Sequence, residues 1–519
     1  MAVLLEAMSM KGRFVSGVRH CVALAASSSS RLFWTFAVAH LSLWTLVPTL
    51  VSPNAPLDVV EGYVWGHEWL LGTYKHPPMQ AWWLEILTHL TSHAPWTHFF
   101  ASQLAVIIAF WAVWQTGRRI LTEQAALLAV LLLEGVVYYN FTSPEFNPNV
   151  LQLPFWALIG LFFHRAVKDD RGSDWVLLGL WSACGLYSKY STVIILLILG
   201  LLLVVHPESR RRLIGKGPYL AVLTTFLLFL PHLVWLANNN FMPIHYMESR
   251  MHHLDSNVEY IMRPLRFLIS QILVTLPFIL LLLALIGKKI FSPEKIERPL
   301  SFDESFLYAV TFGPLVLLLL MGLSGARLHD MWGTPILGFL GIWAVKHFQN
   351  AISSRALRRF TFGWLSVFIV ILASYAGASV FYPYVTHQSQ RIYFPGRALA
   401  KAVIGTWEQK YHVPLRYIIG DTWPAGNIAY YPPGRQHVLI DGDYKISPWI
   451  KPKDIEQYGA VLVWCIANCA CKNQTQAMPS YVQNFSKAEI QKPLVLKRRT
   501  GADIPPVTIG WAILPPSSQ

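Results

Sequence analysis

An uncharged apolar segment at residues 305–323 reads SFLYAVTFGPLVLLLLMGL. A transmembrane helix needs about 20 mostly apolar residues, so this segment is long enough to cross a bilayer. Similar segments lie at 32–51, 97–116, 121–139, 148–166, 173–189, 190–206, 217–238, 264–287, 332–347 and 361–382. The sequence therefore predicts a polytopic α-helical membrane protein with about 11 spanning helices.

The composition agrees with this class. Of 519 residues, 54% are hydrophobic and 13% are charged, whereas an ordinary soluble protein has about 25% charged residues. These fractions exclude a disordered chain, a collagen and a small disulfide-rich scaffold, and five cysteines set no disulfide framework.

The positive charge is unevenly divided between the two sides of the predicted spans. Lys and Arg are concentrated on one side, for example at 118–119, 210–216 and 355–359. The other side carries Lys75, Lys189, Arg250, Arg263 and Arg327. Because cytoplasmic loops are enriched in Lys and Arg, we expect a cytoplasmic N-terminus and an external C-terminus. The net charge of +14 then reflects topology, and nucleic acid is not an expected partner.

The chain divides into three parts by composition. Residues 1–31 form a cytoplasmic N-terminal segment, and residues 32–382 form the membrane domain with a long first external loop at 52–96. In residues 383–519, apolar runs of strand length alternate with helical patterns, which predicts a small external α/β domain. Its Cys465, Cys469 and Cys471 lie outside the reducing cytosol, so one disulfide between two of them is expected.

The first external loop holds the clearest candidates for chemistry. Asp58 and Glu61 are three residues apart, which places both carboxylates on one face of a helix. Such a pair suits a general base, a cation or an ammonium group, but it also suits a helix N-terminus, where acids are stabilised. Lys75 precedes a His-Pro-Pro step that holds the backbone extended. It is either a ligand for a lipid phosphate or an anchor whose stem packs on apolar surface.

Other external loops add separate ionisable side chains. Glu145 lies in a turn before a predicted span, and Lys189 lies between two apolar segments, where an ionisable residue is a functional candidate. Arg327 is permanently charged and planar, as suits a phosphate ligand. The loop containing Arg250 is rich in histidine, but it lacks the i, i+4 pair that would form a helical metal site. No Gly-rich nucleotide-binding loop is present.

The acid pair and the run Tyr74-Lys75-His76-Pro77-Pro78 together resemble the GT-C glycosyltransferases. The resemblance is to the bacterial branch of aminoarabinose transferases and lipid A galacturonosyltransferases, relatives of protein O-mannosyltransferases. It extends in architecture over 32–382, although members of that family often have about thirteen spans.

The resemblance implies transfer of a sugar, with inversion, from a polyprenyl-phosphate donor to a lipid acceptor of the lipid A or lipopolysaccharide type. The reaction would take place on the periplasmic side of the bacterial inner membrane. Asp58 and Glu61 would be catalytic, and the donor phosphate would bind Lys75, Arg327, Lys189 and Arg250. Secondary candidates are His76, Glu145 and His329. No metal ligand is assigned, and participation of a divalent cation is left open.

Three other functions fit parts of the pattern. The first is a flippase or transporter of lipid-linked sugars, the second is a glycosyltransferase acting on protein, and the third is a non-enzymatic assembly or receptor protein. A transporter would need ionisable residues deep within spans or broken helices in matched halves. The charges considered above instead lie at the external ends of the spans.

Overall fold

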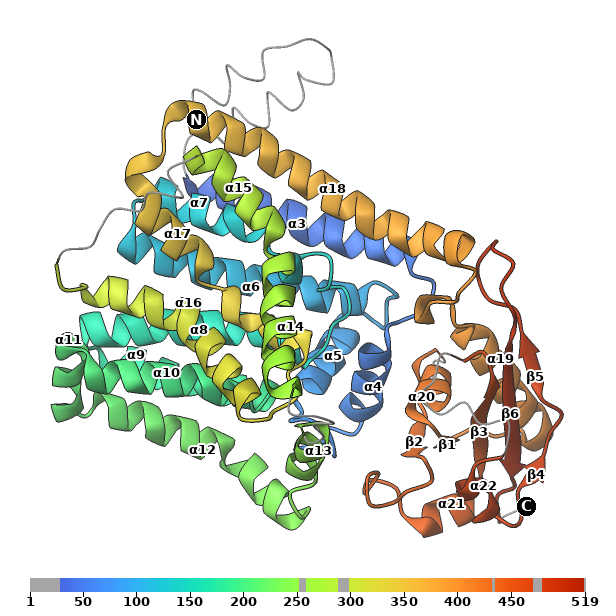
Figure 1. Cartoon of the computed structure of the whole chain (residues 1–519). Helices are drawn as coiled ribbons and strands as arrows, with labels where there is room; N and C mark the ends of the chain where they lie inside the picture. The colour runs from blue at the N-terminus through green and yellow to red at the C-terminus, as the bar shows by residue number, and fades with distance from the viewer. Residues whose placement is uncertain (1–28, 252–257, 288–297, 432–434, 470–477, 518–519) are drawn as a thin grey trace.

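The computed structural model describes residues 29–251, 258–287, 298–431, 435–469 and 478–517. Figure 1 shows long helices running side by side, with a smaller sheet-containing domain at one end of them. The helical part contains α3 (Ser29–Val51), α4 (Leu57–Gly66), α5 (Met79–Leu90), α6 (Thr97–Ile120), α7 (Glu123–Leu133), α8 (Pro148–Asp169), α9 (Gly172–Ser188), α10 (Thr192–Val205), α11 (Pro207–Arg210), α12 (Gly217–Asn238), α13 (Met242–Met251), α14 (Glu259–Val274), α15 (Leu276–Ile286), α16 (Phe302–Leu323), α17 (Leu340–Phe348) and α18 (Ser354–Thr386).

Within the described residues, six helices are long and apolar enough to cross a membrane, namely α3, α6, α8, α12, α16 and α18. Two bent pairs raise the number to eight if each is one span: Thr192–Val205 with Pro207–Ile214, and α14 with α15. These criteria give fewer spans than the sequence-based number of about 11, which stays a prediction. Each predicted segment does contain a helix, but α7, α9 and α17 are short, and prolines lie at the breaks of both bent pairs.

The surface of the helical part is apolar where a bilayer would contact it. α12 and α18 expose large apolar side chains such as Val222, Leu227 and Ile369. In contrast, α6 and α8 lie in the interior and are buried over most of their length. Exposed contiguous apolar surface is rare in soluble monomers and is typical of a lipid-facing helix.

The C-terminal part is the expected α/β domain, although α18 extends to Thr386. It contains α19 (Gly396–Tyr411), β1 (Tyr417–Gly420), α20 (Thr422–Tyr430), β2 (His437–Ile440), α21 (Pro452–Tyr458), β3 (Ala460–Ala467), α22 (Ser480–Gln483), β4 (Glu489–Ile490), β5 (Leu494–Leu496) and β6 (Val507–Leu514). The strand order is β2-β1-β3-β6-β4, with β5 also paired to β6. β1 pairs in parallel with β2 and β3, whereas β6 is antiparallel to β3, β4 and β5.

The α/β domain packs on the segment between α3 and α6, which carries α4 and α5 (Figure 1). α20 lies against α4 so closely that a Cβ at Gly426 would lie 2.7 Å from Val60. Across the same contact, Arg435 forms an ion pair with the buried Glu85, and Tyr431 donates a hydrogen bond to Asn54 (2.7 Å). α4 is therefore enclosed between the membrane helices and the α/β domain.

Candidate active site

Both first-loop carboxylates lie on α4. Pro56 precedes this helix in an extended conformation, so that Asp58 falls in the first turn and Glu61 lies one turn later on the same face. α5 packs tightly against α4, because a Cβ at Gly66 would lie only 2.6 Å from the carbonyl oxygen of Ala81. The close contacts on both sides hold the acid pair in a fixed position.

Glu61 forms an ion pair with Lys75, and both side chains are largely buried. The turn that presents Lys75 is built around Thr73, whose hydroxyl accepts hydrogen bonds from the backbone N–H groups of Lys75 (3.3 Å) and His76 (3.1 Å). The Lys75 ammonium lies 5.2 Å from the centre of the Tyr74 ring. Burial is the largest single effect and lowers the pKa of Lys75, but the charge and hydrogen bond of Glu61 together with Tyr74 and Tyr246 raise the pKa above its ordinary value. Lys75 is therefore held as a charged group beside the acid pair.

Asp58 presents the unengaged carboxylate of the pair. In the described part of the chain this carboxylate has no hydrogen-bond partner, whereas the backbone carbonyl of Asp58 accepts from Gln80 (3.1 Å). Burial raises the pKa of Asp58 above its ordinary value of 3.8, and the positive charges of Lys75, Arg391 and Lys189 oppose that rise. The surroundings are thus electrostatically positive, and the carboxylate is available to a ligand.

Lys189 lies at the turn between α9 and α10. Its ammonium donates a hydrogen bond to Asn149 (2.5 Å) and lies 5.8 Å from the centre of the Trp332 ring. Burial lowers the pKa of Lys189 to about 8, against the effect of the negative charge of Asp58. The Lys189 ammonium therefore loses its proton more easily than that of an exposed lysine.

The remaining predicted basic residues surround this centre. The pKa of His76 is lowered to about 3, first by burial and then by the positive charges of Lys189 and Arg250. The pKa of His329 is also lowered, first by burial and then by Arg250 and Arg327. Cations from separate loops therefore lie close enough to influence the same two imidazoles, while Arg250 and Arg327 keep exposed side chains.

Glu145 and three residues that the sequence analysis missed also contribute charge to this site. The three missed residues are Arg391, Asp421 and Asp441. Desolvation and the charge of Asp58 raise the pKa of Glu145 to about 7, against the effect of Arg391. Desolvation and Asp421 raise the pKa of Asp441 to about 6. Asp441 directly follows β2, a position from which an acid could have been selected as a candidate. Arg391 lies in the connection between the two parts of the chain, where the sequence offered no signal.

Among the described residues, one group of at least three side chains of metal-ligating types lies close enough together to hold a metal ion, and it is not the acid pair. The ligand atoms of His67, Glu68 and His437 all lie within 4.8 Å of one another. The predicted disulfide is confirmed between Cys465 and Cys469. The third cysteine of that region, at position 471, and the histidines at 252 and 253 lie outside the described residues.

Comparisons with known proteins agree with this architecture. Residues 75–235 match the family described as dolichyl-phosphate-mannose-protein mannosyltransferase. The chain is 22% identical over 483 residues to the lipopolysaccharide core galacturonosyltransferase RgtB of Rhizobium johnstonii. The aligned residues make up 90% of this chain and 93% of RgtB. It is 23% identical over 197 residues to RgtA of the same organism, covering 37% of this chain and 40% of that relative.

Among solved structures, ArnT from Cupriavidus metallidurans bound to undecaprenyl phosphate has a similar fold, with a TM-score of 0.60 at 12% sequence identity. The similarity covers 92% of this chain and 97% of ArnT. The predicted resemblance is confirmed: the chain has the GT-C fold and resembles ArnT. It is a polytopic membrane protein, and the family match and relatives support glycosyl transfer as its class of activity.

Proposed function

We propose that this protein transfers a sugar from a polyprenyl-phosphate donor to a lipid acceptor of the lipopolysaccharide type. In this proposal the reaction takes place at the periplasmic face of the inner membrane and inverts the anomeric centre. The related RgtA and RgtB are named as galacturonosyltransferases of the lipopolysaccharide core, and the similar ArnT was crystallised with undecaprenyl phosphate.

The observation that supports this function best is the free carboxylate of Asp58 among converging cations. Lys75 and Lys189 both lie close enough to influence the pKa of Asp58. An anionic lipid donor needs positive charge at its phosphate, and an acceptor hydroxyl needs a base at the position it attacks from. A carboxylate and several cations on one side of α4 supply both requirements.

In this proposal each residue has its own role in a single step that displaces polyprenyl phosphate from the anomeric carbon. The acceptor oxygen bonds to the anomeric carbon as the bond from that carbon to the phosphate oxygen breaks, and the electron pair leaves with the polyprenyl phosphate. Asp58 takes the proton if the acceptor is a hydroxyl, or orients the acceptor if it is already an anion. Lys75, Lys189, Arg250 and Arg327 bind the donor phosphate and stabilise its growing charge. Glu61 acts through Lys75, as a positioning residue.

The test is transfer by purified protein in lipid nanodiscs. Undecaprenyl-phosphate sugars carrying galacturonic acid, aminopentose or neutral hexose are each supplied with lipopolysaccharide core and lipid A, and mass spectrometry measures addition of the sugar. We expect addition to the lipid from at least one donor. Asp58→Asn should lower the rate by about 10²–10⁴ while donor binding persists. Asp503→Asn, which changes an exposed carboxylate of the α/β domain, should transfer at the wild-type rate.

Other outcomes would identify the competing functions. Movement of donor lipid across the bilayer without sugar addition would contradict the proposal and identify a flippase. Addition to protein but not to lipid would change the acceptor class. Wild-type transfer by Asp58→Asn would remove this carboxylate from the mechanism.

A further inference from the structure

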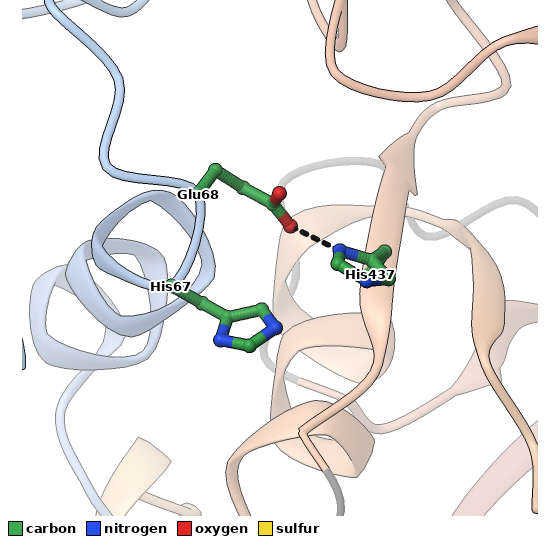
Figure 2. Close-up of side chains that lie close together, drawn as sticks. All are labelled: His67, Glu68 and His437. Carbon is green, nitrogen blue, oxygen red and sulfur yellow. Dashed lines mark hydrogen bonds and ion pairs between the residues drawn. The ribbon is translucent and has the colours of Figure 1, made fainter.

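A second set of chemically reactive side chains lies at the other end of α4, where the α/β domain contacts it. Figure 2 shows His67 and Glu68 at the end of α4 and His437 at the start of β2, with the three side chains converging. The Nδ1 atom of His437 and a carboxylate oxygen of Glu68 are 2.6 Å apart, and the ring centres of His67 and His437 are 5.0 Å apart. Two imidazoles and one carboxylate from two parts of the chain therefore meet at one point.

His67 is the member of this group whose ring makes no hydrogen bond within the described residues. In the part of the chain that the structure describes, neither nitrogen of its ring has a hydrogen-bond partner, although the ring is partly buried against His437. The cavity beside His67 gives water access to the ring, so an ion could replace water at a ring nitrogen without breaking a hydrogen bond within the described residues.

We propose that His67, Glu68 and His437 bind a divalent transition metal ion of the zinc type. Two histidines and one glutamate form a ligand set typical of zinc with three protein ligands, which leaves a fourth position for water. Zinc–ligand bonds of about 2.0–2.2 Å in a tetrahedron require ligand atoms roughly 3.3–3.5 Å apart. The atoms already lie within 4.8 Å of one another, so small side-chain movements suffice.

The surroundings suit such an ion. A cavity of about 430 Å³ borders His67 and is lined also by Tyr63, His93, Arg397 and Arg435, which gives water access to the fourth position. The positive charge of the nearby Arg435 is partly offset by its ion pair with the buried Glu85. This pairing reduces, but does not remove, the repulsion between Arg435 and a bound cation.

The position of the site indicates a structural role. Successive α-helical residues rise by about 1.5 Å, so the metal group lies roughly 14 Å along α4 from Asp58. It also lies on a different face of the helix, since 100° per residue separates positions 58 and 61 from position 67. The ion would join α4 to β2 and hold the α/β domain against the candidate active site.

The experiment measures metal binding in the full-length protein, so its result is independent of sugar transfer. Protein purified in detergent is treated with a chelator and then titrated with zinc, and bound metal is measured by calorimetry and elemental analysis. We expect wild type to bind one zinc ion, and cobalt in its place to give the intense visible bands of a four-coordinate site. His67→Ala and Glu68→Gln should each weaken zinc binding at least tenfold.

His93→Ala is the matched control, because His93 is an exposed histidine on the same cavity. It should bind zinc as wild type does. His67→Ala is the decisive variant, since it removes no hydrogen bond seen between described residues and should leave the fold intact. Equal zinc affinity in wild type and His67→Ala, or a wild type that binds no zinc, would overturn the proposal.

Discussion

The pH dependence of donor binding tests the role of Lys189 as a phosphate ligand. Burial lowers the pKa of Lys189 to about 8, so the ammonium is charged below this pH and neutral above it. If phosphate binds only the charged form, the apparent Kd rises as 1 + 10^(pH − pKa), which is roughly 11-fold at pH 9. Lys189→Arg keeps its charge throughout this range. We therefore expect Lys189→Arg to lose less affinity than wild type between pH 7 and pH 9, because the ionisation of Glu145, whose pKa is about 7, is common to both proteins.

Fluorescence provides the assay, because the Trp332 ring lies 5.8 Å from the Lys189 ammonium. Undecaprenyl phosphate is titrated into protein in nanodiscs; the second pKa of a phosphate monoester is about 6, so the probe keeps nearly constant charge above about pH 7. His76 has a pKa of about 3 and stays neutral in this range. Lys401→Arg, which changes an exposed lysine of α19, should keep the wild-type pH profile. An identical alkaline loss in wild type and Lys189→Arg would refute the assignment.

Three further substitutions test other parts of the structure. Lys75→Ala should weaken donor binding about tenfold to hundredfold, through loss of a charged hydrogen bond of about 1.5–3 kcal/mol, and unchanged affinity would instead favour an anchoring role. Arg435→Ala leaves the carboxylate of Glu85, which is 1% exposed, with the imidazole of His89 as its remaining ion-pair partner among the described residues. We expect the free energy of unfolding to fall by about 3–5 kcal/mol, which lowers the Tm. The added change Glu85→Gln should partly restore the Tm. If it restores nothing, lost charge pairing is not the cause. Gly66→Ala places a Cβ 2.6 Å from the carbonyl oxygen of Ala81, and should lower the Tm through about 1–3 kcal/mol of overpacking; an unchanged Tm would mean that α4 and α5 can separate.

The membrane class and the acid pair were accessible from the sequence because each depends on local spacing. The length of an apolar run predicts a membrane span whatever the run packs against in the fold. The three-residue separation of Asp58 and Glu61 places them on the same face of a helix. The alternation of strand-length apolar runs and helical patterns predicted in residues 383–519 likewise corresponds to strands such as β2 and helices such as α19. Hydropathy does not register the bends at prolines or the shortness of α7 and α17, so fewer helices reach full spanning length than the number of predicted segments.

The partners of these residues required the tertiary structure. Glu61 and Lys75 are 14 positions apart, and the sequence could not select the ion pair between them over a role for Glu61 in binding the acceptor. Arg391 comes close to Asp58, Asp421 to Glu61 and Asp441 to Lys75 only because the chain after α18 folds back onto the first loop.

Local periodicity and composition were therefore sufficient for the class of protein, its α/β domain and the helix that carries the candidate carboxylates. The electrostatic environment of those carboxylates and the metal-ligand group at the end of α4 depend on contacts between segments hundreds of residues apart. The pair His437 and Glu68 is separated by 369 positions. Such contacts are set by chain topology and packing, which no local pattern of residues encodes.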